Sequence, residues 1–549
     1  MKNWFFLLFF VLQIKLYAQD ELLGLLANEL ERQEQEFQQL NPSPYYLSFK
    51  VDEVQLHEIH ADFGGITLSD ENFIRLANVD VRVGDYKKDN TSVPNANAFG
   101  MRSTPIPIDN DEQGVSYMMW ILSDLKYKVA ENIYKTISAN SDPSGEEIAS
   151  FSKEEVAVYY EEPLSKEKTA LEVEKWESLL KSLSAFGDQL PNVIQSSVRL
   201  SHKVIRKYFL DTEGRSIVQN HQNCLLSINL NLVDDFNNQV PLSKTFSVQT
   251  LNQLPDEEEL KEEMSQLMEL AKSLSSASYV EPYSGPILFS GPASAVFFHE
   301  VLGHRIEAER LSQITDGQTF VNKVETEILP EKINIRSLPS LQEYNGTVLT
   351  GGYLYDDQGV RAQDVTITED GVLKRFLMSR KPIKSFSGSN GHSRCSEGGT
   401  PVTRQSNLIV ESPKGHSSKK LRELLLKECK KQNKPFGYFI DQVEGGFTTT
   451  DRYQPNTINI LPMIVYKVFV DGRPDELVKG MSLTGTPLNV FSEIMAVGNE
   501  YGIFSGYCGA ESGYIPVSAV SPGLLIRKME VQRKPIAKTK LPILSLPTN

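Results

Sequence analysis

The segment Ser294-Ala-Val-Phe-Phe-His-Glu-Val-Leu-Gly-His-Arg-Ile-Glu-Ala-Glu309 combines an apolar start with a HExxxH pattern. Neutral imidazole is a good zinc ligand, and a glutamate beside it can take a proton from a metal-bound water. On a regular α-helix His299 and His304 would lie about 140° apart, so an unbroken helix cannot direct both at one ion. We therefore expect a π-type turn or a helix break at Gly303, where the backbone yields most easily.

The flanking sequence favours a buried metal-binding helix. The apolar strand Pro286-Ile-Leu-Phe-Ser290 precedes the turn signal Gly291-Pro292, and a small, apolar first helical turn follows. Glu307 lies three residues after His304, where it can orient a ligand histidine. The pattern alone leaves open a buried helix whose histidines only form hydrogen bonds, because such a triplet arises by chance in roughly one chain in a hundred.

Together with motifs further along the chain, this segment resembles the TldD/PmbA metallopeptidases, specifically their metal-bearing TldD-type members. The similarity covers the second half of the chain and includes Tyr355-Asp-Asp-Gln-Gly-Val360, Ile367-Thr-Glu-Asp-Gly-Val-Leu-Lys374, Gly445-Gly446, Val478-Lys-Gly480, Gly506-Tyr-Cys-Gly509 and Ile515-Pro-Val517. In that family the third ligand is a cysteine near the C-terminus, which only Cys508 matches. The resemblance implies one zinc ion per chain, held by His299, His304 and Cys508, with Glu300 as general base.

The resemblance also implies an activity, the hydrolysis of peptide bonds in small or unfolded peptides held in extended form along a sheet edge. Glu300 would take the proton of a zinc-activated water and pass it to the leaving amine. His392 is a candidate for stabilising the oxyanion. Members commonly work with a related chain that lacks the ligands, so we expect a homodimer or a heterodimer with a family member. Two alternatives stay open: a non-catalytic, peptide-holding partner of a related family member, and a zinc hydrolase acting on non-peptide amides.

The patterning predicts an α+β fold with two domains. Residues 19–280 are expected to form a mixed α/β domain, because helices and strands segregate with hairpin-like turns. Its expected helices are 20–40, 116–139, 166–186 and 256–273, and its expected strands are 45–51, 79–83, 193–200, 204–210 and 226–232. A Ser-rich, Pro-bearing linker at 275–285 marks the domain boundary.

Residues 281–549 are expected to form a largely antiparallel β domain that carries the metal-binding helix. Asp370-Gly371 and Asp471-Gly472 are two-residue hairpin signals. Short helices are expected at 421–431 and 488–497, and the glycine-rich strands between them favour a curved sheet or an open barrel. Cys508 would return to the metal helix on a loop.

Residues 1–18 have the features of a signal peptide. Lys2 precedes the apolar run Trp4–Leu12, and Ala18 offers a small residue before Gln19. The run is too short to span a membrane stably, so we expect an exported, periplasmic or secreted protein that leaves the membrane after cleavage; an uncleaved anchor is the alternative. The net charge of −15 and the lack of a basic run argue against binding to nucleic acid.

The four cysteines form no CxxC pair, so neither a disulfide-rich scaffold nor a zinc knuckle is indicated. Metal binding would keep Cys508 as a thiolate in an oxidising compartment. The alternative is a disulfide to Cys395 or Cys429, which would remove the third ligand. His57 and His60 are expected to be surface histidines, on opposite faces of a strand.

Overall fold

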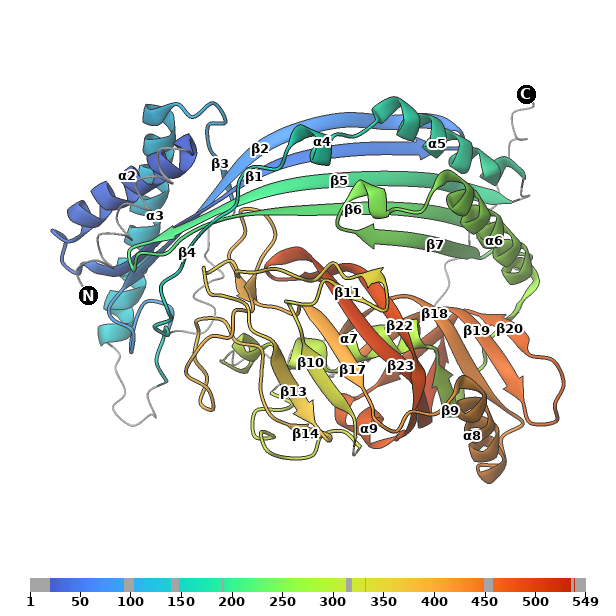
Figure 1. Cartoon of the computed structure of the whole chain (residues 1–549). Coiled ribbons are helices and arrows are strands. Elements are labelled where there is room, and N and C mark those ends of the chain that lie inside the picture. The colour runs from blue at the N-terminus through green and yellow to red at the C-terminus, as the bar shows by residue number, and fades with distance from the viewer. Residues whose placement is uncertain are drawn as a thin grey trace.

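The computed structural model describes residues 20–92, 103–139, 148–189, 192–312, 318–330, 332–448, 458–534 and 538. The predicted signal peptide at 1–18 lies outside the described residues. Within them the chain has the predicted α+β architecture. A long seven-stranded sheet with helices arches over a second unit, which is built on a twelve-stranded sheet (Figure 1).

The first sheet has the order β3-β2-β1-β5-β6-β4, with β7 beside β6, and only β4 and β6 pair in parallel among its described strands. The strands are β1 Pro44–Asp62, β2 Gly65–Val83, β3 Thr104–Pro105, β4 Val158–Tyr160, β5 Val193–Asp211, β6 Ser216–Val233 and β7 Gln239–Val248. The two strands predicted at 193–200 and 204–210 are one continuous strand, β5. The predicted break between these two segments was wrong, because His202 within it pairs with strand β1 on one side and with strand β6 on the other.

Helices cover the two ends of this sheet (Figure 1). They are α2 Glu21–Phe37 and α3 Glu112–Ala139 at one end, and α5 Val173–Ala185 and α6 Glu257–Ser276 at the other. The helix predicted at 166–186 is split into α4 Lys166–Thr169 and α5, because Ala170 takes an extended conformation. Helix α6 begins after Asp256, whose carboxylate accepts a hydrogen bond from Glu259 N in a capping box.

The central part of the first sheet buries a histidine that was predicted to be exposed. His57 is 8% exposed, and its ring stacks on His202 with 6.1 Å between ring centroids. The prediction for His57 was wrong because β1 has a neighbouring strand on each side, which encloses the His57 side chain between cross-strand partners.

The second unit is largely antiparallel, as predicted, with three parallel pairings among its described strands: β8/β20, β9/β18 and β17/β23. The successive pairs β23–β9–β18–β19–β21–β23 close into a ring. The strands of the large sheet are β8 Ser278–Tyr279, β9 Tyr283–Phe289, β10 Asn334–Ser337, β13 Val365–Glu369, β14 Val372–Leu373, β17 Asn407–Glu411, β18 Phe436–Thr448, β19 Ile458–Phe469, β20 Glu476–Lys479, β21 Met481–Gly485, β22 Ile494–Ala510 and β23 Gly513–Arg533.

Helix α7, Gly291–Val301, lies at the centre of this unit, and every residue from 293 to 301 is buried. A helix that is apolar on all sides must be enclosed, and α7 packs against β9, β17, β18, β19, β22 and β23. Two 3₁₀ turns follow it, η4 Gly303–Arg305 and η5 Ala308–Ser312. Helix α8, Ser418–Lys431, packs on the outside of β9 and β18.

The two predicted hairpins differ in outcome. Asp370-Gly371 connects β13 to β14 with φ values of 48° and 83°, as a two-residue turn requires. Asp471-Gly472 lies in a longer loop between β19 and β20, because Pro474 cannot donate to a strand ladder. The helix predicted at 488–497 is the shorter α9, Pro487–Ser492, and β22 already begins at Ile494. None of the described helices has the length and apolar character needed to cross a membrane.

Candidate metal centre

The helix that carries the HExxxH pattern breaks between its two histidines. Ser290 caps the start of α7 by accepting a hydrogen bond from Ala293 N, and the helix ends at Val301. Arg305 then folds back and donates to the carbonyls of Glu300, at 2.9 Å, and Val301, at 3.1 Å, which the helix leaves free at its end. The predicted helix break is confirmed, and it is a 3₁₀ turn instead of a π-type turn.

Gly303 is the first residue of that turn, as predicted. Close packing at this position, and not the flexibility of its backbone, explains why the residue is a glycine. A Cβ atom built on Gly303 would lie 1.9 Å from Oε1 of Gln405, whose amide approaches the carbonyl of His299 at 3.5 Å. Gln405 is 1% exposed, so its side chain has no free space to move into. The glycine therefore lets a distant segment pack directly on the helix break.

The break brings the three predicted ligands together. One ligand atom from each of His299, His304 and Cys508 lies within 4.8 Å of the others, and Cys508 Sγ is 3.5 Å from His304 Nε2. Bonds of about 2.0–2.3 Å to one tetrahedral ion would separate neighbouring ligand atoms by roughly 3.5 Å. Cys508 lies on strand β22, opposite Ile515 of β23, and not on a loop as expected. All four cysteines are free, so the alternative disulfide is absent among the described residues.

The donor atoms fit a metal ion of the zinc type. The Nδ1 atom of His304 is 3.2 Å from Oε2 of Glu307, which leaves Nε2 facing Cys508. This is the carboxylate–histidine arrangement that orients metal-ligating imidazoles. The Nδ1 atom of His299 is buried and has no hydrogen-bond partner among the described residues. Two imidazoles and a thiolate are a donor set that zinc accepts.

Electrostatics at the cluster favour a thiolate. Burial alone would raise the pKa of the Cys508 thiol, but His304 and His299 hold that pKa well below its ordinary value. Burial likewise acts to raise the pKa of Glu307, yet His304 and Arg310 bring it down to about 2. Glu307 is therefore ionised and can hold the Nδ1 proton of His304.

Arg404 links the cysteine strand to the helix break. Its guanidinium is fully buried and donates to the carbonyl of Cys508 at 2.6 Å and to Oγ of Ser512 at 2.7 Å. Its Nε atom lies 3.8 Å from Oε1 of Glu307, the carboxylate that contacts His304. One side chain thus touches both segments that supply ligands.

A cavity of about 390 Å³ opens beside the three ligands. Glu300 lines it, is 6% exposed and has an Oε2 atom without a hydrogen-bond partner among the described residues. A Cβ atom on Gly446 would lie 2.6 Å from Cγ of Glu300, so the glycine allows strand β18 to approach this carboxylate. The other walls of the cavity are Val296, Arg310, Glu444, Gly445, Phe447, Thr448, Phe504, Tyr507, Gly509, Ala510 and Glu511.

One predicted site residue does not reach the cavity. His392 is fully buried elsewhere, where its ring contacts Ser337 Oγ at 3.0 Å and the side chain of Asn390. Burial lowers the pKa of His392 to about 3. Its assignment as an oxyanion-stabilising group was wrong. Sequence reasoning in turn missed Arg404 and Gln405, for which the only signal was an Arg-Gln pair in an otherwise unremarked segment.

Part of the chain matches a known protein family. Residues 282–533 match the family model of the PmbA/TldA metallopeptidase C-terminal domain. The chain is 30% identical over 243 residues to a metalloprotease of Archaeoglobus fulgidus, which covers 44% of this chain and about half, 51%, of the relative. It is 23% identical over 365 residues to the zinc metalloprotease TldD homolog of Saccharolobus solfataricus, covering 66% of this chain and 76% of that relative.

The fold also matches that of solved structures. TldE from Thermococcus kodakarensis superimposes with a TM-score of 0.59 at 14% sequence identity, over 92% of this chain and 99% of TldE. At this identity the likeness concerns the fold alone.

Proposed function

We propose that this chain, a member of the TldD/PmbA family of metallopeptidases, is a zinc-dependent peptidase that hydrolyses small or unfolded peptides. The observation that carries the proposal is the meeting of His299, His304 and Cys508 within 4.8 Å beside Glu300 in one cavity. These three side chains would hold the ion, and the adjoining cavity would admit water and substrate.

When bound, the ion would polarise the scissile carbonyl and acidify a water molecule at its open position. Glu300 is adjacent in sequence to His299, and its unpartnered Oε2 atom is available to accept the proton of that water. The same carboxyl group would then give the proton to the leaving amine. Glu307 keeps the imidazole of His304 in the tautomer that presents Nε2 to the ion.

The open edge of β18 supports an extended peptide as the substrate. Strand β9 pairs with β18 only at 438–440, and beyond this point the described part of β18 pairs with β19 alone. The unpaired side of β18 therefore offers backbone donors and acceptors, and Glu444–Thr448 line the metal cavity. A peptide that adds to this edge as a strand would be held through its backbone, with its scissile bond near Glu300.

Metal content and turnover test the proposal together. We expect about one zinc per chain in the wild type by elemental analysis, and a strong reduction in Cys508→Ser. Glu300→Gln should keep the zinc and the fold, while cleavage of a panel of unfolded peptides falls by at least ~100-fold, as expected for loss of a general base. A wild-type chain that binds no zinc under reducing conditions would overturn the proposal.

The competing function is a peptide-holding partner without catalysis. It predicts that Glu300→Gln changes nothing and that peptides bind without being cut. A zinc hydrolase of non-peptide amides would instead cleave small amides in preference to the extended peptides.

A further inference from the structure

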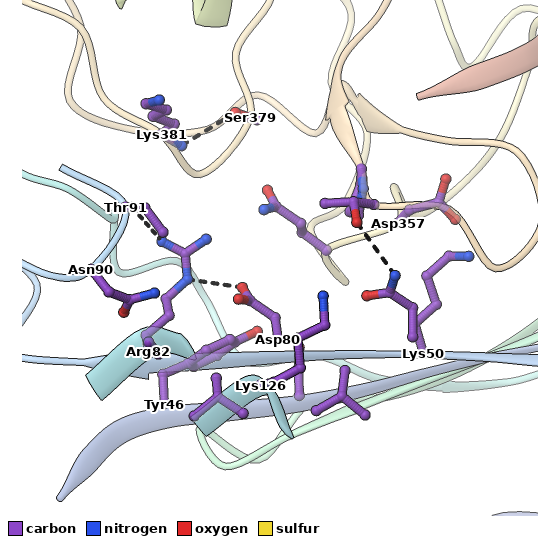
Figure 2. Close-up of a pocket in the computed structure, with 18 of the residues that line it drawn as sticks. Tyr46, Lys50, Asp80, Arg82, Asn90, Thr91, Lys126, Asp357, Ser379 and Lys381 are labelled. Carbon is purple, nitrogen blue, oxygen red and sulfur yellow. Dashed lines mark hydrogen bonds and ion pairs between the residues drawn. The ribbon is translucent and has the colours of Figure 1, made fainter. Parts of the chain in front are cut away.

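A second cavity, of about 120 Å³, lies between the two units of the molecule (Figure 2) and shares no lining residue with the cavity beside the metal cluster. Strands β1 and β2 and helix α3 form one wall, and loops of the second unit form the other. Figure 2 shows Tyr46, Arg82 and Lys126 on the first wall, facing Ser379 and Lys381 on the second. Clefts between units are frequent sites for small ligands.

Most charges around this cavity are already paired. Arg82 bonds Asp80 at 2.9 Å, and Lys50 forms a buried ion pair with Asp52. Asp357 pairs in the same way with Lys207, at 2.6 Å. Because these charges neutralise one another, the paired groups line the cavity without favouring the binding of a charged ligand.

Two lysines are the exception. The ammonium groups of Lys126 and Lys381 have neither an ion-pair nor a hydrogen-bond partner within the part of the chain that the structure describes. Both side chains are partly buried. Burial lowers the pKa of Lys126, with the charge of Asp80 opposing this only in part. Asp80 and Glu309 act on Lys126 and Lys381 through their charges but form no direct ion pair with them, which leaves both ammonium groups able to contact a bound anion.

One carboxylate of the lining, that of Glu309, forms no ion pair with the described residues. Glu309 is 6% exposed and accepts a hydrogen bond from Thr403 N at 3.2 Å. Burial raises the pKa of Glu309, and the charge of Lys381 opposes this rise. The hydroxyl and amide groups of Ser379, Thr400 and Asn90 complete a lining rich in donors.

We propose that this cavity binds a small oxyanion, a phosphate or a carboxylate, between Lys126 of α3 and Lys381 of the facing loop. The volume is roughly ten times the ~10–15 Å³ that one water needs, which suits a compact ion and excludes a polypeptide. The anion would bridge the two units and stabilise their contact. This site is independent of the proposed peptidase activity, because none of its lining residues is a predicted metal ligand or Glu300.

Thermal unfolding of the full chain with inorganic phosphate and with succinate tests the site, at constant ionic strength set by sodium chloride. We expect a saturable rise in Tm with at least one of the two oxyanions, equal in zinc-loaded and EDTA-treated protein. The oxyanion that gives the larger rise in Tm shows whether the site prefers a phosphate or a carboxylate. Lys126→Gln and Lys381→Gln should each weaken the apparent affinity at least tenfold. Lys128→Gln, an exposed lysine on the same helix that pairs with Asp124, is the matched control and should bind like the wild type.

Chemical labelling of the wild-type chain tests the same site without any variant, so it remains decisive if a variant fails to fold. The oxyanion should slow acetylation of Lys126 and Lys381 by acetic anhydride, read by mass spectrometry, and leave Lys128 unaffected. The proposal is overturned if neither oxyanion exceeds chloride, if the shift requires zinc, if folded glutamine variants keep the wild-type affinity, or if protection is equal at all three lysines.

Discussion

Arg404 is the residue through which the two ligand-bearing segments contact each other. It donates to the carbonyl of Cys508 and lies 3.8 Å from the carboxylate of Glu307, which in turn contacts His304. Because Arg presents a rigid planar fork, lysine cannot reproduce both contacts. Arg404→Lys should weaken zinc binding by about 10–100-fold, the usual effect of losing a group that supports metal ligands. Competition with a chelator measures this affinity.

Arg394 provides the matched control for this substitution. It is also buried and donates to two carbonyls, Gln405 O at 2.6 Å and Pro516 O at 3.0 Å, and within the described residues it forms no hydrogen bond to a ligand side chain. Arg394→Lys should lower the Tm and leave zinc affinity within a few-fold. Equal losses of affinity in the two variants would mean that Arg404 acts through overall stability and does not position Cys508.

At the scale of elements, the break after α7 depends on the contact between Gly303 and Gln405. Gly303→Ala places a methyl group where Oε1 of Gln405 now lies, and overpacking of this kind typically costs about 1–3 kcal/mol. We expect a lower Tm and weaker zinc binding, because the clash displaces the turn that carries His304. The double variant Gly303→Ala/Gln405→Ala removes the clash, and it should recover zinc affinity relative to Gly303→Ala. A double variant with no recovery would argue against packing as the reason for glycine.

The helix break is also the part of the site that the sequence predicts best. Helical geometry alone requires His299 and His304 to be separated by an irregularity, and Gly303 is where it occurs. Cys508 could be named only from the family resemblance, since strand pairing brings β22 to α7 from far along the chain. Arg404 was not predictable for the same reason.

Local patterns were reliable for amphipathic helices and less so for strand limits. The stripe of Leu260, Met264, Leu267 and Ala271 is buried along α6, as its spacing predicts. Strand β5 runs through the predicted gap at 201–203 because neighbours on both sides satisfy its backbone. Such pairing is a property of the assembled sheet, and single-strand patterns do not contain it.

At the scale of the whole molecule, Asp234 connects the two units. It follows β6 in the first unit and pairs with Lys479 of β20 at 2.9 Å, while Tyr279 of β8 donates to it. Burial acts to raise its pKa, but the hydrogen bonds from Tyr279 and Lys479 bring the pKa down to about 2. The value in an unfolded chain is about 3.9.

This difference makes the connection pH-dependent. Because the folded pKa is the lower one, Asp234 contributes its full stability above about pH 5 and loses it as the pH falls towards 2. The contribution is about 2–3 kcal/mol at pH 7. Asp234→Asn should lower the free energy of unfolding at pH 7 by at least that amount, since Lys479 stays buried. Urea titrations at pH 7 and pH 3 should show a smaller gap between variant and wild type at pH 3; a gap that does not change with pH would contradict the assignment.

The closed ring of β9, β18, β19, β21 and β23 determines which backbone amides exchange first with solvent. Helix α7 packs against four of these strands, β9, β18, β19 and β23, and has no exposed residue from 293 to 301, so its amide hydrogens have no local route to solvent. Their exchange with deuterium should require opening of the whole ring, and would report the global stability of the second unit. The amides on the unpaired side of β18 should exchange orders of magnitude faster, although they lie within the same cavity as the helix. His299 and Glu300 would thus be held by a slowly exchanging helix, next to a strand edge that exchanges freely.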